Sequence, residues 1–160
     1  MESWEEIYNL EITEQYPAAI EAIEERLKSN SEKEEGVIHL GFLYWLGIVE
    51  DERLNLNVSF QQYAARFREL LNTYQSVFDN NADFCFSYGF GLSMDYYYFA
   101  RDAKDTKELN LYESLGKSLL EKAKRLSPFY KKLLNGKVSQ QEISQHFAKR
   151  GCFLKYYSIV

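Results

Sequence analysis

The sequence predicts an all-α fold in which antiparallel helical hairpins stack on one another, with about seven or eight helices in a single domain over residues 1–160. Three observations predict it. Apolar residues recur at intervals of three and four, capping residues precede these stripes, and the chain resembles itself at an offset of 47 residues. Two prolines and eight glycines in 160 residues suit helices with tight connections.

Capping boxes predict where five of the helices begin. In such a box the side chain of a Ser, Thr or Asn accepts a hydrogen bond from the backbone N–H three residues later. The Glu or Gln at that later position accepts a hydrogen bond from the backbone N–H of the capping residue. The pairs are Ser3 and Glu6, Ser31 and Glu34, Ser59 and Gln62, Asn110 and Glu113, and Ser139 and Glu142. A further helix is expected from about Thr13 to Ser29, with Pro17 in its first turn.

These boundaries give three hairpins, at about 13–50, 59–102 and 110–135. The first helix, 3–10, precedes them, and a last helix, 139–150, is expected to end at Gly151. The tail beyond Gly151 is rich in aromatic and aliphatic residues. We therefore expect it to fold back on the helices, with completion of a partner surface as the alternative.

Residues 83–102 contain eight Phe or Tyr in twenty positions. Phe84 and Phe86 begin an alternation that fits a β-strand, but twenty residues without a turn are too long for one strand. A helix that is apolar nearly all round packs between neighbours. The stretch is therefore interpreted as a buried helix in which Gly89 and Gly91 permit close approach of another backbone, with residues 96–98 the most exposed.

Two segments repeat the same apolar spacing. The stripe that begins at Tyr16 matches the stripe that begins at Tyr63, and a weaker third copy begins at Tyr112. Each stripe is followed by a second helix, and Gly41 and Gly89 occupy the same place in the first two. The repeat predicts stacked helix pairs that bury one another's apolar faces.

The charge of −5 is unevenly distributed. Residues 1–35 carry a net charge of −8, residues 36–102 carry −4, and residues 103–160 carry +7. An acidic front would repel nucleic-acid phosphates and suits a basic protein partner, although a solvated Glu-rich helix surface would look the same. The longest uncharged run has 14 residues, short of the ~20 that a membrane helix needs, and the acidic first residues are unlike a signal peptide. We expect a cytoplasmic protein without membrane or nucleic-acid binding.

The sequence offers no recognisable catalytic, cofactor or metal motif, so we do not expect an enzyme. His39 and His146 have no Cys, His or carboxylate at the usual ligand spacing. Glu142 stands four residues before His146, and an exposed ion pair is favoured there over a shared metal. Cys85 lies among aromatics and should be inert, whereas the positive charge of the nearby Arg150 can lower the pKa of Cys152.

Two stretches carry a resemblance to tetratricopeptide repeats. "YPAAIEAIEERLKSN" followed by "EKEEGVIHLGFLYWLG" resembles one such unit, and "LLEKAKRLSPFYKKLL" is similar to the end of a repeat and its Pro-initiated successor. This resemblance implies a short α-α superhelix of TPR-like hairpins.

Compact size, an acidic front, degenerate helical repeats and the lack of catalytic groups resemble the immunity proteins of bacterial polymorphic toxins, including contact-dependent growth inhibition systems. The resemblance implies that the chain binds and neutralises the toxin domain of a secreted or surface effector. Carboxylates would meet the partner's Lys and Arg, and tyrosines would supply a desolvated centre. The expected partner-binding residues are Glu24, Glu25, Glu32, Glu35, Glu50, Asp51, Glu52, Asp95, Tyr97 and Tyr98.

Two other functions remain open at this point. A TPR-like chaperone or scaffold would bind an extended peptide of a secreted protein along a concave groove, and a groove of suitable width would favour it. A small-molecule sensor would instead use a pocket between aromatic helices.

Overall fold

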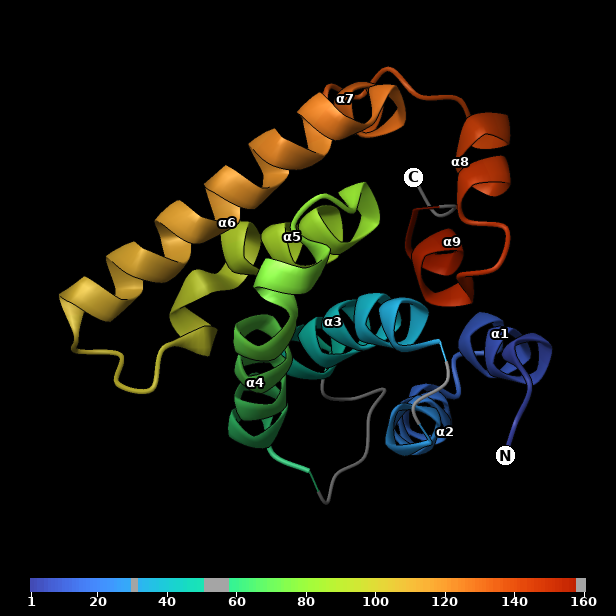
Figure 1. The fold of residues 1–160 in the computed structure, drawn as a ribbon, viewed down its shortest axis with the longest axis horizontal. Coiled ribbons are helices and arrows are strands. Elements are labelled where there is room, and N and C mark those ends of the chain that lie inside the picture. The colour runs from blue at the N-terminus through green and yellow to red at the C-terminus, as the bar shows by residue number, and fades with distance from the viewer. Residues whose placement is uncertain (30–31, 51–57, 158–160) are drawn as a thin grey trace.

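The computed structural model describes residues 1–29, 32–50 and 58–157, and all regular structure in these ranges is α-helical (Figure 1). The predicted all-α class is therefore confirmed. The nine helices of the described ranges are α1 (Trp4–Ile12), α2 (Tyr16–Lys28), α3 (Lys33–Val49), α4 (Phe60–Phe78), α5 (Ala82–Phe99), α6 (Thr106–Leu126), α7 (Pro128–Leu134), α8 (Gln140–His146) and α9 (Gly151–Tyr157).

Consecutive helices pack against each other from α1 to α7, as the hairpin prediction requires. The second helices of the first two hairpins, α3 and α5, also pack on each other and form the centre of the molecule. Every residue from Gly36 to Ile48 is buried, because α3 is covered by α2, α4, α5 and α9. Figure 1 shows α6 along one edge of the molecule and α1 and α2 on the opposite side.

The aromatic stretch forms α5, so the helical interpretation is confirmed and the strand alternative is wrong. Tyr88 is fully buried, and its hydroxyl donates a hydrogen bond to the Val37 carbonyl at 2.8 Å. A Cβ at Gly89 would lie 2.9 Å from the Leu119 Cβ, so this glycine lets α6 approach α5 closely. The helix kinks at Asp95, whose φ of −138° is not helical.

Three predicted helix starts differ from the structure. α2 begins at Tyr16 and not near Thr13, which instead caps the C-terminal end of α1. α6 begins at Thr106 and not near Asn110, because the Asp105 side chain accepts hydrogen bonds from the N–H groups of Lys107 and Glu108. This cap satisfies the orphan donors one turn earlier than the expected box. α3 begins at Lys33 after Glu32, which has a left-handed φ of 52°, and the predicted cap Ser31 lies outside the described residues.

The predicted C-terminal end of the last helix, at residue 150, is wrong. α8 stops at His146, and Gly151 begins a ninth helix, α9, in place of ending the eighth. Gly151 is required for close approach, since a Cβ there would lie 2.8 Å from the Tyr8 carbonyl oxygen of α1. The expectation that the tail folds back is confirmed up to Tyr157: Phe153 of α9 is buried, and its ring stacks on Phe42 at 4.3 Å between centroids.

None of the helices in the described ranges combines the length and apolar character required to cross a membrane.

Candidate functional site

A cleft of about 740 Å³ opens where the N-terminal ends of α3 and α5 face α8 and the α8–α9 connection. Apolar side chains, Trp4 and Ile38, form part of its wall. Its charged lining consists of four carboxylates and two basic side chains, Glu32, Glu34, Glu35, Asp83, Lys149 and Arg150. The cleft therefore has an excess of negative charge and is the best candidate for a binding site in the described chain.

The two inner carboxylates are held by one guanidinium. Arg150 donates from Nε and Nη2 to the Glu35 carboxylate at 2.8 and 2.9 Å, and its Nη1 lies 2.8 Å from an Asp83 oxygen. Burial alone would raise the pKa of both carboxyls. Hydrogen bonds from Arg150 and His39 outweigh the effect of burial on Glu35 and lower its pKa to about 2. Hydrogen bonds from His146 and Arg150 likewise lower the pKa of Asp83 well below its usual range. Both inner acids are thus ionised at neutral pH.

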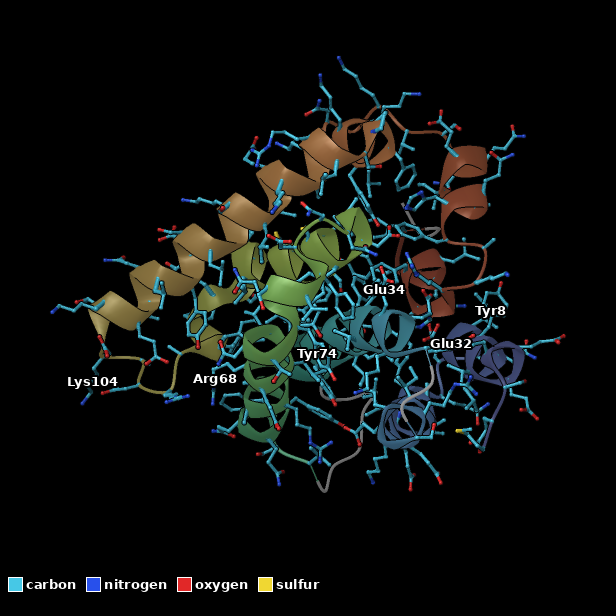
Figure 2. The ribbon with its side chains drawn as sticks, in the orientation of Figure 1. Tyr8, Glu32, Glu34, Arg68, Tyr74 and Lys104 are labelled. Carbon is cyan, nitrogen blue, oxygen red and sulfur yellow. The ribbon has the colours of Figure 1, made fainter. Side chains whose placement is uncertain are left out.

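The carboxylates at the mouth of the cleft are exposed (Figure 2). Glu32 accepts a hydrogen bond from the Trp4 indole and pairs with Arg26 at 3.2 Å, yet its side chain remains 57% exposed. Glu34 accepts a hydrogen bond from the Asn81 amide. A carboxylate has about four acceptor positions, so both residues keep positions open for a partner.

A fully buried cluster of Glu11, His39 and Cys152 lies behind this cleft, adjoining it through Glu35. His39 bonds to Glu11 through Nδ1 and to Glu35 through Nε2, the latter at 2.9 Å. The backbone N–H of Cys152 donates to Glu11 Oε2 at 3.0 Å. Burial opposes a charge on His39, but the two carboxylates outweigh it and raise its pKa to about 9.

Sequence spacing missed this cluster, because its members come from α1, α3 and α9. The structure corrects the expectation that no Cys or carboxylate accompanies His39. It also corrects the expectation for Cys152. Burial, together with the charge of Glu11, raises the pKa of this thiol well above its usual value, and the positive charge of Arg150 is too weak to reverse the shift.

The expected ion pair between Glu142 and His146 is not formed. His146 Nε2 instead lies 2.9 Å from an Asp83 oxygen and 3.3 Å from the Tyr130 hydroxyl. Its ring stacks on Phe129 with centroids 3.8 Å apart. Glu142 contacts Lys132 and the cap residue of α8 instead. His146 therefore forms part of the cleft wall.

Of the expected partner-binding residues, the cleft brings together Glu32 and Glu35. Glu25 is exposed on α2. Glu24 faces α4, where it accepts hydrogen bonds from the Tyr44 hydroxyl at 2.6 Å and from Arg66 at 3.0 Å. Glu24 therefore joins the first two hairpins.

Another group lies at the far ends of α3 and α5, where Glu50, Asp95, Tyr97 and Tyr98 are found. The Asp95 carboxylate accepts a hydrogen bond from the Trp45 indole at 2.8 Å. Tyr97 is 48% exposed, and Tyr98 meets the exposed ring of Phe60 edge-on at 5.7 Å. Fourteen residues of helix separate Asp83 from Tyr97, or roughly 20 Å along α5, so the structure does not unite the predicted residues in one site.

Asp51 and Glu52 lie outside the described residues. The sequence analysis missed several contributors, among them Glu34, Asp83 and Arg150 in the cleft and Phe60 beside Tyr98. The acidic run at residues 32–35 was a usable signal for Glu34. Asp83 and Phe60 gave none, because only the packing of α5 and α4 places them.

Comparisons with family models, curated proteins and solved structures found no match to this chain. A function for the cleft must therefore be inferred from the chemistry of its lining residues. The pKa shifts of its inner acids, Glu35 and Asp83, are both downward, which does not suit donation of protons, and their charge is already paired with Arg150. The unpaired capacity for a cation lies in the outer carboxylates.

Proposed function

We propose that this chain is a non-enzymatic protein-binding module, and specifically an immunity protein that binds the toxin domain of a secreted or surface effector in the bacterial cytoplasm and neutralises it. The observation that carries the proposal is the surface charge of residues 1–29 and 32–35. Seven glutamates are exposed there, Glu2, Glu5, Glu6, Glu21, Glu25, Glu32 and Glu34, whereas Lys28 is the one exposed basic side chain in those ranges.

The fold places the basic helices α6 and α7 far from the acidic helices α1 and α2, which supports binding of a basic partner in one orientation. The acidic helices α1 and α2 lie across the molecule from α6 and α7, and residues 103–137, which include these two helices, carry nine basic and four acidic residues, a net charge of +5. Figure 2 shows Lys104 and Glu32 on opposite sides. Such a charge distribution steers a basic domain toward the acidic side and away from α6.

The cleft at the edge of this acidic surface gives the partner a place to insert a basic side chain. A Lys or Arg that enters would meet Glu32 and Glu34 at the mouth. Glu35 and Asp83, the inner acids, are already paired with Arg150. A cation would therefore gain little electrostatic attraction by moving from the mouth to the inner end of the cleft. We therefore assign the toxin contact to the mouth of the cleft and the adjoining surface of α1 and α2.

The proposal is tested by co-expressing the chain with the C-terminal domain of a secreted or surface protein encoded immediately upstream. We expect the chain to restore growth, and the purified proteins to associate rapidly with a rate that falls as salt rises. The double variant Glu32→Gln and Glu34→Gln should slow association and flatten its salt dependence. Glu121→Gln, an exposed glutamate on α6, should leave both unchanged.

Failure to protect against that domain, or association that does not depend on salt, would refute the proposal. Equal losses in Glu121→Gln and in the double variant would refute the assignment of the contact to the cleft mouth.

The second candidate is a TPR-like chaperone or scaffold that binds an extended peptide of a secreted protein. The observation that favours it is an open cleft of about 740 Å³, a volume within the range of clefts that bind ligands. The two functions differ in the state of the partner. An immunity protein binds the folded toxin domain, whereas a chaperone binds the same chain when it is unfolded in urea or supplied as overlapping peptides.

A further inference from the structure

We propose that Glu11, His39 and Cys152 form a structural zinc site that joins α1, α3 and α9. The site is separate from the cleft mouth and does not depend on the proposed function. It rests on three features of the structure: the donor set, the convergence of the donor atoms, and an outer carboxylate that orients the histidine.

The donor set is one that zinc prefers. Thiolate sulfur, imidazole nitrogen and carboxylate oxygen are the three protein ligands of Zn²⁺, and Cys152, His39 and Glu11 supply one of each. One thiolate and one carboxylate also balance the two positive charges of the ion. A neutral site of this kind avoids burying net charge in the core.

The donor atoms converge on one point. One ligand atom from each residue lies within 4.8 Å of the others. Ligand atoms on a tetrahedral zinc ion are about 3.5 Å apart, which follows from bonds of about 2.0–2.3 Å. The three side chains therefore supply three of the four positions around a tetrahedral ion, and the hydrogen bond between Glu11 and His39 must open for the ion to enter.

The outer partners of the cluster match those of zinc sites. A ligating histidine usually donates its other ring N–H to a carboxylate, which fixes the ring. His39 has this arrangement: Nε2 bonds to Glu35 at 2.9 Å, and Arg150 holds Glu35, so Nδ1 is the nitrogen left for the metal. Glu11 is held in the same way, since its Oε2 accepts the Cys152 N–H and its Oε1 faces the histidine.

Burial indicates a structural role. All three ligands are fully buried, whereas a catalytic zinc must meet its substrate. The ligands are distant in sequence, since His39 is 28 positions and Cys152 is 141 positions after Glu11. A zinc ion would therefore link the two ends of the described chain. Its binding would release two protons to solvent, the thiol proton of Cys152 and the Nδ1 proton of His39.

The test uses the full chain, stripped with a chelator and titrated with Co²⁺ and then Zn²⁺ in the absence of any partner. We expect one equivalent of Co²⁺ to produce thiolate-to-cobalt charge-transfer absorption, and Zn²⁺ to displace it and raise the Tm. Cys152→Ser should abolish the absorption and the rise in Tm. Cys85→Ser is the matched control, because Cys85 is buried but lies outside the cluster, and it should behave like the wild type.

Glu11→Gln provides a second variant that keeps an acceptor for the Cys152 N–H, and it should weaken Zn²⁺ affinity by more than about tenfold, the lower end of what an outer partner contributes. Folded wild-type protein that gives neither cobalt–thiolate absorption nor a change in Tm would overturn the site and leave a hydrogen-bonded Glu11–His39 pair in its place. Retention of the absorption in Cys152→Ser would also overturn it.

Discussion

Arg150 donates two hydrogen bonds to Glu35, a residue 115 positions earlier in the chain, at 2.8 and 2.9 Å. The same guanidinium pairs with Asp83 at 2.8 Å. One side chain from the α8–α9 connection thus joins the N-terminal ends of α3 and α5 and forms the inner wall of the cleft. Removal of this side chain should loosen the packing of the C-terminal helices on the central pair.

Arg150→Met should lower the free energy of unfolding by about 2–3 kcal/mol, because it leaves two partly buried carboxylates without their partner. Breaking a fully buried pair costs about 3–5 kcal/mol, and the smaller value expected here allows for the 31% exposure of Glu35. Urea denaturation monitored by circular dichroism measures the change.

The matched control is Lys149→Met, since Lys149 is exposed beside Arg150 and should change stability by less than about 0.5 kcal/mol. Adding Glu35→Gln to Arg150→Met should recover part of the loss, because it removes one of the unpaired charges. A double variant less stable than Arg150→Met would contradict this account.

Asp83 should make stability depend on pH in the acid range. Its folded-state pKa is lowered below the unfolded value of about 3.9, because bonds from His146, Arg150 and Tyr130 outweigh the effect of burial. A lowered pKa means that the contribution of Asp83 is present above the unfolded pKa and is lost as the pH falls through the folded pKa. The urea midpoint of the wild type should therefore fall from about pH 5 to pH 2 more steeply than that of Asp83→Asn.

Tyr130→Phe gives a graded check, since it removes one hydrogen bond to Asp83 and keeps the carboxyl. Its pH dependence should lie between those of the wild type and Asp83→Asn. Glu35 titrates low as well, so Asp83→Asn should flatten the curve without making it level. Parallel curves for wild type and Asp83→Asn would show that Asp83 does not carry this dependence.

The contact of α5 with α6 should not tolerate a methyl group at Gly116. A Cβ there would lie 2.6 Å from the Ser93 backbone nitrogen and 2.9 Å from the Leu92 Cβ. Alanine favours the helix over glycine by about 1 kcal/mol. Overpacking typically costs about 1–3 kcal/mol, and the cost is high here because the nearest atoms belong to the backbone of α5, which can move away only if the two helices separate. We expect Gly116→Ala to destabilise the protein by about 1–2 kcal/mol in urea denaturation.

Ser114→Ala on the same helix is exposed and should be neutral or slightly stabilising. If Gly116→Ala were as stable as this control, the close approach of the two helices would not be essential to the fold.

The helical pattern was readable because each hairpin buries a stripe whose period is local. Tyr16, Tyr63 and Tyr112 were found by that period, and all three are buried. Two helix boundaries at the C-terminal end were not readable. Gly151 is a common helix stop, but here tertiary contact decides its use, since it lies against the Tyr8 carbonyl and starts α9.

The candidate sites were less predictable than the fold, because they are made by residues far apart in the chain. Glu32 was recognised from local charge, and it does line the cleft. Glu11 lay between two expected helices and carried no signal of its own in the sequence, yet it is fully buried. Tertiary packing explains this, because α9 brings the Cys152 N–H and α3 brings His39 to the Glu11 carboxylate.

The packing of α9 leads to the last prediction, that Phe153→Ala destabilises the whole domain by about 3–5 kcal/mol, the range for a fully buried phenylalanine. Phe153 is 1% exposed, and its ring stacks on Phe42 at 4.3 Å and on Phe147 at 5.0 Å. Loss of the ring would leave a cavity between α3, α9 and the end of α8. Leu126→Ala, at a residue 41% exposed, is the control and should cost less than about 1 kcal/mol. Thermal and urea unfolding that left Phe153→Ala as stable as Leu126→Ala would show that α9 is an appended helix and contributes little to the core.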